Sequence, residues 1–106
     1  MIFFGALGVA GKIYSLPNQG DTTTINLTEL TLDKTGYGVF EICETNDYSS
    51  MIIANRYATA GLQVISDSDT RPVLNLFDIE KTVAGPTIKI TAKTTMQNGG
   101  VFVKAL

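Results

Sequence analysis

Acidic side chains two or three residues apart are the first place where this sequence could do chemistry. Glu41 and Glu44 form one such pair, and Asp78 and Glu80 form another. A glycosidase needs two carboxyl groups, one as general acid and one as base or nucleophile. The chain, however, has no tryptophan for sugar stacking and no histidine, the commonest general base. We therefore expect solvent-facing carboxylates on strands and no enzymatic activity, with a hydrolase using Glu41 and Glu44 as the third-ranked hypothesis.

Two further motifs lack the residues that their chemistry requires. The single cysteine, Cys43, has no histidine to lower its pKa and no second cysteine to pair with, so we expect a half-buried strand residue. The stretch from Ala6 to Ile13 is similar to a phosphate-binding loop. Ala6 stands where the first glycine belongs, and Ile13 where serine or threonine ligates magnesium. The sequence therefore predicts no nucleotide and no cofactor.

Asp67 and Asp69 alternate within the polar run Ser66–Thr70. Carboxylates in such a loop can converge on a calcium ion. The glycine bend and the bidentate glutamate of a calcium-binding loop are missing, which favours a solvated loop with local hydrogen bonds. The sequence leaves open whether Asp67 and Asp69 bind a cation.

Tyrosine and arginine at loop tips are the best candidates for surface binding, because interfaces are enriched in both. Arg56 and Tyr57 follow an apolar run and precede a turn, and Tyr48 stands before the same run. We predict surface binding at Tyr48, Arg56 and Tyr57. The alternative is that the tyrosines are ordinary strand residues with their hydroxyls at the rim.

Length and charge limit the partners of this chain. Its 106 residues suit one domain, and a hydrophobic content of 44% supports a buried core. The net charge is −2, and lysine and arginine form no basic run, which argues against nucleic-acid binding.

The first ten residues carry no charged side chain. They are too few to span a bilayer, and Lys12 follows the apolar stretch instead of preceding it as in a signal peptide. We predict no membrane insertion. A turn-rich stretch ends near residue 20, so we divide the chain into an apolar, glycine-rich arm (1–20) and a β-domain (21–106). The arm residues predicted to contact another subunit or a virion are Ile2, Phe3, Phe4, Leu7 and Val9.

The rest of the chain alternates short strand patterns with turns at roughly ten-residue spacing. Leu30 and Leu32 reverse the alternation of Ile25 and Leu27, which predicts a bulge or a crossing near residues 28–29. Asn98-Gly99-Gly100 is a strong hairpin signal. The pattern predicts an all-β fold, an antiparallel β-sandwich or jelly-roll-like domain of seven or eight strands with an extended N-terminal arm. The expected strands are 22–32, 37–44, 48–57, 62–65, 73–79, 87–93 and 101–106.

The order of the strand sequences from residue 37 to 106 resembles a known class of protein. The segments that carry the resemblance are Gly38–Ile42, Met51–Ala54, Gln63–Asp67, Ile88–Ile90 and Gly99–Lys104. Together they resemble the small β-sandwich heads of bacteriophage fibre, head-fibre and capsid-decoration proteins. The resemblance implies a homo-oligomer, most simply a trimer, whose arm contacts other virion proteins and whose β-head is displayed on the virion.

The function expected from the residues and the resemblance is therefore that of a non-enzymatic virion structural protein. It would be tail-associated, a head fibre or a capsid decoration, and would aid assembly or host attachment. The alternative is a carbohydrate- or protein-binding β-sandwich unrelated to virions.

Overall fold

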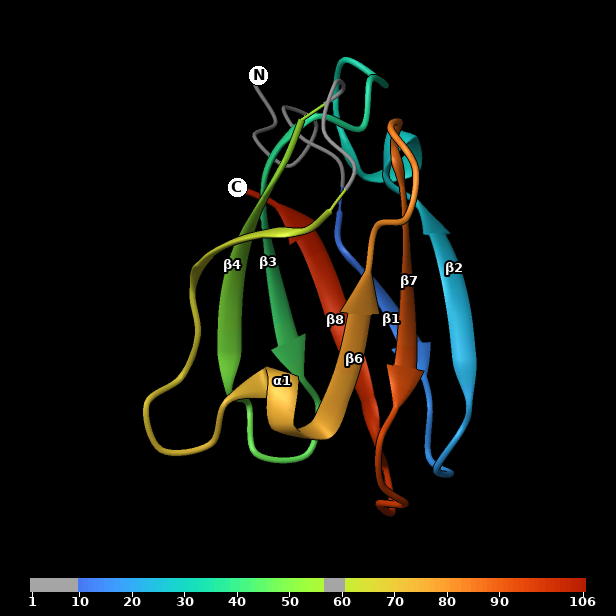
Figure 1. The fold of residues 1–106 in the computed structure, drawn as a ribbon, viewed down its shortest axis with the longest axis vertical. Coiled ribbons are helices and arrows are strands. Elements are labelled where there is room, and N and C mark those ends of the chain that lie inside the picture. Colours follow the sequence, from blue (N-terminus) through green and yellow to red (C-terminus); the bar gives the residue numbers. More distant parts are fainter. Residues whose placement is uncertain (1–9, 57–60) are drawn as a thin grey trace, which may run out of the picture.

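The computed structural model describes residues 10–56 and 61–106, which form two antiparallel β-sheets packed face to face (Figure 1). The five-stranded sheet has the order β1 (Lys12–Ser15), β8 (Gly100–Ala105), β3 (Gly38–Glu44), β4 (Ser50–Asn55) and β5 (Gln63–Ser66). The three-stranded sheet has the order β2 (Thr22–Asn26), β7 (Thr87–Ala92) and β6 (Phe77–Glu80). The predicted all-β antiparallel sandwich of seven or eight strands is confirmed.

The core lies between the two sheets and is built by alternate residues of each strand. In a strand, successive side chains point to opposite faces, so residues two apart share one face. Phe40 and Ile42 of β3 are fully buried against Ile88 and Ile90 of β7 and their neighbours in one core cluster. This alternation is the reason why the strand pattern in the sequence was sufficient to predict the fold class.

The first described strand lies inside the segment that the sequence analysis assigned to the arm. Residues Lys12–Ser15 pair antiparallel with Val103–Gly100 of β8, and Leu16, 3% exposed, belongs to the core. The β-domain therefore begins at least as early as Lys12, not at residue 21. Residues 1–9 of the predicted arm include all five predicted contact residues and lie outside the described part of the chain.

The Asn98-Gly99-Gly100 turn exists, but it does not join a hairpin. Asn98 has a positive φ of 61°, as such a turn requires, and the Gly99 amide donates to the Met96 carbonyl at 2.9 Å. The strands on either side, β7 and β8, belong to different sheets. The predicted hairpin is wrong because a local turn signal does not specify which sheet the chain enters next.

Two short helices replace parts of predicted strands. A 3-10 helix, η2 (Leu27–Leu30), follows β2, and the Asn26 side chain accepts a hydrogen bond from its first turn. The helix buries both Leu27 and Leu30, so the reversed alternation near residue 28 marks a helical turn and not a bulge. One turn of α-helix, α1 (Val73–Leu76), likewise precedes β6.

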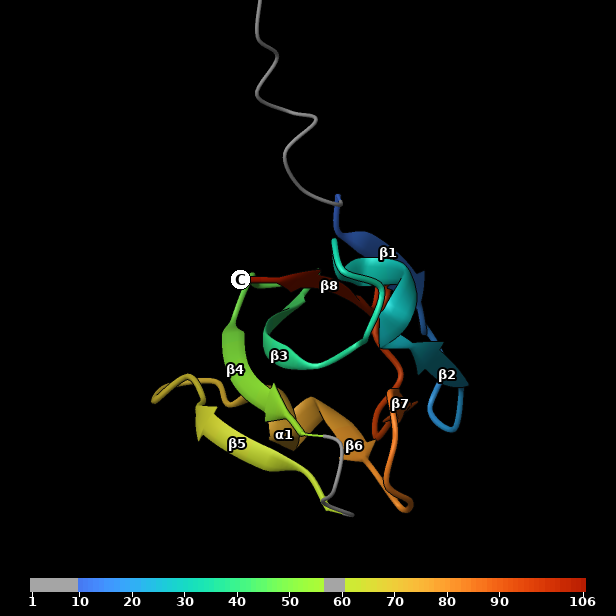
Figure 2. The same cartoon turned by 90° about the horizontal axis from the view of Figure 1, so that it is seen from above.

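The two sheets differ in width, which leaves β5 without a covering strand among residues 10–56 and 61–106. Viewed from above, the five-stranded sheet curves around the smaller sheet, and β5 lies at the outer edge (Figure 2). Val64 of β5 pairs with the fully buried core residue Ile53 of β4, yet Val64 itself is 39% exposed. A register shift between Ile52 and Ile53 places Ile65 out of the pairing, and Ile65 is 54% exposed.

Candidate functional site

Glu44, one of the predicted acid–base candidates, is a structural residue of the turn between β3 and β4. Its side chain is buried and accepts hydrogen bonds from the backbone amides of Asn46, at 2.8 Å, and Asp47. Both carboxylate oxygens are therefore used to hold the turn. Glu44 points into the sandwich, on the same face as Phe40 and Ile42, whereas Glu41 points outward.

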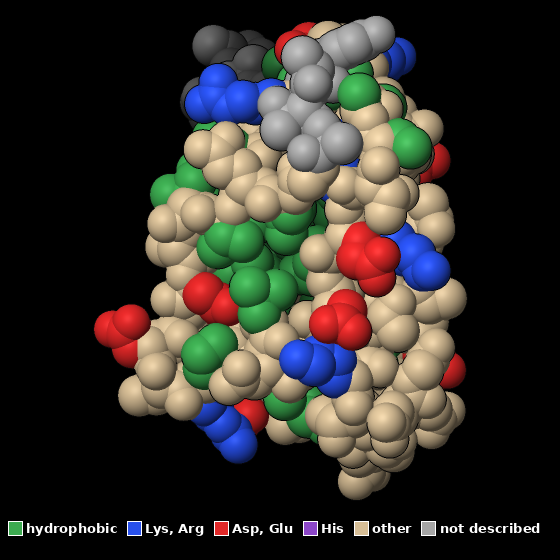
Figure 3. Space-filling model, in the orientation of Figure 1, with side chains coloured by type: hydrophobic (Ala, Val, Ile, Leu, Met, Phe, Trp, Pro, Cys, Tyr) green, Lys and Arg blue, Asp and Glu red, His purple; other side chains and the backbone are tan. Residues whose placement is uncertain are grey.

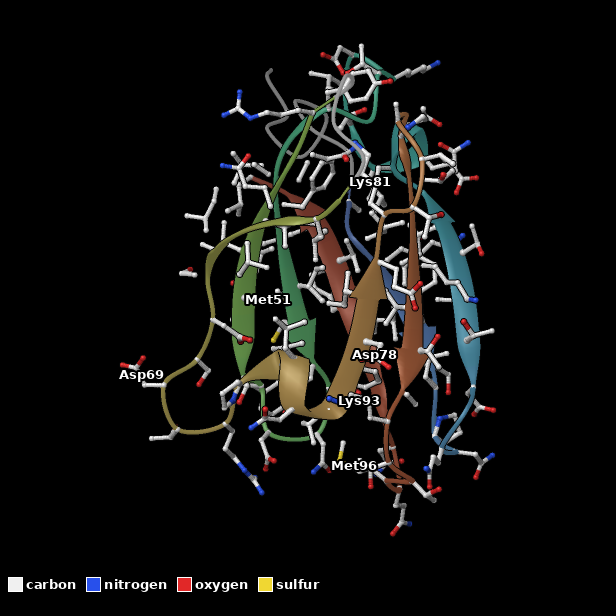
Figure 4. The ribbon with its side chains drawn as sticks, viewed as in Figure 1. Met51, Asp69, Asp78, Lys81, Lys93 and Met96 are labelled. Atoms are coloured by element: carbon white, nitrogen blue, oxygen red, sulfur yellow. The ribbon has the colours of Figure 1, made fainter. Side chains whose placement is uncertain are left out.

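The other carboxylates of these pairs lie on the outward faces of their strands. Glu41 accepts from the Ser50 hydroxyl at 2.6 Å and lies 3.6 Å from the Lys104 ammonium on the outer face of the sheet. Asp78 and Glu80 lie on the exposed face of the edge strand β6, and Asp78 is 4.0 Å from Lys93 (Figure 4). Glu41 and Glu44 thus face opposite sides of β3, whereas Asp78 and Glu80 share the exposed face of β6.

Asp67 and Asp69 have different environments. The Asp67 carboxylate accepts from the backbone amides of Val73 at 2.8 Å and Leu74 at 3.2 Å, which satisfies two free amides at the start of α1. Asp69 is exposed and points away from the protein at the loop tip (Figure 4). Within residues 10–56 and 61–106, no group of three histidine, cysteine or acidic side chains could hold a metal ion.

Cys43 lies on the outer face of β3, where it is half-buried between neighbouring strands. Burial raises the pKa of its thiol, and the negative charges of Glu41 and Glu44 raise it further, opposed by Lys104. The thiolate is therefore disfavoured at neutral pH. A thiol in this environment is a poor nucleophile.

The three residues predicted for surface binding do not form one site. Tyr48, 76% exposed, lies in the turn that precedes β4, and Arg56 directly follows the other end of the same strand. A six-residue strand separates them, which corresponds to roughly 20 Å at about 3.3 Å per residue. Tyr57 lies outside the described residues.

Arg56 borders an open pocket of about 290 Å³ at the end of the β3–β4 pair. Tyr37 from the preceding turn lines the same pocket, together with Val39, Ala54 and Asn55. The Arg56 guanidinium donates to the Gln63 amide oxygen at 3.2 Å and remains exposed. An aromatic ring, a small apolar floor and an exposed cation are a suitable combination for a carbohydrate or peptide group.

Two buried polar residues that the sequence analysis missed support this end of the sandwich. Asn55, 1% exposed, donates to the Gly36 carbonyl at 2.7 Å and so fixes the turn that carries Tyr37. Lys81, 5% exposed, donates to the Arg56 carbonyl, and burial lowers the pKa of its ammonium. Strand alternation could have indicated both, because Asn55 continues the inward phase of Met51 and Ile53, and Lys81 follows Phe77 and Ile79 in the same way.

A second candidate surface lies on the uncovered side of β5. Figure 3 shows hydrophobic side chains gathered in a hollow between the β4–β5 side of the molecule and the β6 side. Leu62, Leu74 and Leu76 are partly buried against the core, and Val64 and Ile65 are exposed on β5 itself. We call β5 and these three leucines the β5 surface. The uncharged sequence Gln63–Ser66 was its only signal, because sheet width cannot be deduced from a single strand.

The described residues form a small all-β sandwich with an open pocket beside Arg56 and the exposed apolar β5 surface. In comparisons with known proteins, no family model, no curated protein and no solved structure matches this chain. None of the helices in the described residues is long and apolar enough to cross a bilayer.

Proposed function

We propose that this protein is a non-enzymatic structural module that assembles with copies of itself and is displayed on a virion. The observation that carries the proposal is the β5 surface, where an edge strand exposes Val64 and Ile65 on the open side of the sandwich. Exposed apolar edge strands pair readily with other chains unless charges or a covering segment protect them. In a protein that assembles with copies of itself, such an edge can form the contact between copies.

The acidic side chains support a non-enzymatic role. Glu44 and Asp67, which are the most buried or most hydrogen-bonded of them, hold backbone amides of their own turns. Glu41 is neutralised by Lys104 on an open sheet face. Glu41, Glu44 and Asp67 are thus engaged in contacts within the fold.

The assignment to a virion rests on the resemblance of residues 37–106 to the heads of phage fibre and decoration proteins. In that setting the protein is a homotrimer that contacts other virion proteins through its N-terminal segment. Its proposed role is capsid decoration, a head fibre or a tail-associated part that aids assembly or host attachment.

Sedimentation equilibrium of the full chain tests the assembly on which this function depends. We expect a single trimeric species at micromolar concentration, with no dependence on added metal ions. A protein that remains monomeric up to about 100 µM would contradict the proposal.

The pocket beside Arg56 favours a second candidate function, the binding of a carbohydrate or peptide. Binding on a glycan or peptide array that is lost in Arg56→Ala and kept in Tyr48→Ala would support this function, because Tyr48 lies at the other end of β4. Binding that is insensitive to both substitutions would exclude the pocket as the site.

A further inference from the structure

We propose that residues 1–9 of a neighbouring copy add to the free edge of β5 as an extra strand and cover the β5 surface. This inference rests on the proposed assembly and names the two parts of the chain that meet in it. The acceptor is the strand β5 with its partly buried leucines, and the donor is the uncharged segment that precedes β1.

The acceptor differs from the other edge strands of the described sheets. β6 presents Asp78 and Glu80, and β1 carries Lys12, all of which oppose pairing with an apolar strand. β2 presents threonines and buries its one large apolar residue, Ile25. β5 has no charged residue and no proline; all four of its residues are exposed, and the two apolar ones are Val64 and Ile65.

The donor has the composition that this edge requires. Residues 1–9 contain no charged side chain, so covering them requires no desolvation of an ion. In an extended strand, Phe3, Leu7 and Val9 would share one face, with Gly5 between them. That face matches an apolar hollow, whereas the main-chain groups would pair with β5 and supply affinity by strand addition.

Geometry favours the segment of a neighbouring copy over the segment of the same chain. The described residues begin just before β1, where Gly11 packs closely against the Phe102 ring of β8. β1 and β5 are opposite edges of the same five-stranded sheet. A strand added outside β5 lies five strand spacings from β1, a crossing of about 24 Å, and pairing with four residues needs about 13 Å more. Nine extended residues reach about 30 Å at most, which is less than this sum.

Disulfide trapping between copies tests the contact directly. In a Cys43→Ser background, chains with Leu7→Cys are mixed with chains with Val64→Cys and oxidised. We expect a cross-linked pair containing one chain of each kind. The control replaces Val64→Cys by Val83→Cys, since Val83 is 60% exposed but lies in the loop after β6. Equal cross-linking to position 83 would overturn the inference, as would an internal disulfide in the Leu7→Cys, Val64→Cys double variant.

Sedimentation separates failure of this inference from failure of the proposed function. We expect a chain without residues 1–9, and the Val64→Lys, Ile65→Lys variant, to be monomeric with an unchanged β-sheet circular dichroism spectrum, while Val83→Lys remains oligomeric. Oligomers that persist in the first two proteins would overturn the β5 contact but leave the assembly function intact. A monomeric wild-type protein would contradict both.

Discussion

The stability of a Glu44→Ala variant distinguishes a carboxylate that stabilises the fold from a carboxylate that serves only as a catalytic acid or base. The side chain is 0% exposed and accepts from the amides of Asn46 and Asp47 in the turn between β3 and β4. The Glu44 carbonyl also accepts from the Tyr48 amide at 3.0 Å. Tyr48 has a positive φ of 63°, so the turn is a strained one that depends on these bonds.

The expected loss of stability follows from the two amide donors. A hydrogen bond to a charged group contributes roughly 1.5–3 kcal/mol, and an amide left without an acceptor adds its desolvation cost. Glu44→Ala removes both bonds, so the free energy of unfolding should fall by about 3–5 kcal/mol. Glu44→Gln keeps one carbonyl acceptor and should cost about 1–3 kcal/mol.

Urea unfolding followed by circular dichroism measures both variants. A domain of this size has an unfolding free energy of roughly 5–15 kcal/mol, so both variants should remain folded in buffer unless the wild type lies at the lower limit. In that case Glu44→Gln, the milder substitution, still shows whether the Glu44 side chain contributes to the free energy of unfolding. A Glu44→Ala protein within about 0.5 kcal/mol of wild type would refute the assignment of Glu44 as the residue that holds this turn.

Three further substitutions test other buried contacts by the same unfolding measurement. Burial lowers the pKa of Lys81 in the folded protein below its ordinary value of 10.5. Between these two pKa values the unfolded chain binds more protons than the folded protein, so the stability of the wild type should rise with pH in this range. Lys81→Met should lack this rise. Asp67→Ala removes the acceptor for two amides of α1 and should cost about 2–3 kcal/mol. Gly36→Ala should cost about 2–4 kcal/mol, because Gly36 has a φ of 78° and its Cβ would lie 2.6 Å from Pro86.

Each of these substitutions has a matched comparison in the chain. Burial also raises the pKa of Tyr14, which opposes the alkaline rise, but Tyr14 is present in wild type and Lys81→Met alike. Asp69→Ala removes an exposed carboxylate and should leave stability unchanged. Gly20→Ala carries the same backbone strain at φ 93° without a steric neighbour, so it should cost less than Gly36→Ala. Equal losses of stability in Asp67→Ala and Asp69→Ala would contradict the contact of Asp67 with α1. Equal losses in Gly36→Ala and Gly20→Ala would contradict the contact of Gly36 with Pro86.

The fold class could be predicted because alternation survives in nearly every strand. Phe40 and Ile42, or Ile88 and Ile90, define a buried face without any knowledge of the partner strand. The connection between β7 and β8 could not be predicted, because the Asn98 turn is compatible with a hairpin and with a crossing between sheets. What decides between them is the long-range pairing of β8 with β1 and β3, which no local sequence pattern encodes.

The candidate sites were predictable to a smaller extent. Arg56 was correctly placed at a strand end, where it borders a pocket, but its partner in the sequence prediction, Tyr48, lies at the other end of the strand. Strand alternation places Glu44, Asn55 and Lys81 on inward faces, yet their hydrogen-bond partners are backbone groups of loops. Such partners depend on how loops pack, so residue types alone could not identify them.

The unequal widths of the two sheets connect the fold to the proposed assembly. A segment that leaves at β1 of one copy and pairs with β5 of the next joins two different surfaces, because these strands are opposite edges of one sheet. Such a contact is heterologous, and it closes into a ring only when the rotation between copies divides a full turn; otherwise it continues as a filament. The short reach of nine residues restricts that rotation. Pairing with β5 uses about 13 Å of a reach of about 30 Å, so neighbouring copies must place β1 and the β5 edge within about 17 Å of each other. A closed trimer satisfies every β5 edge with one donor, so no apolar edge remains for further growth.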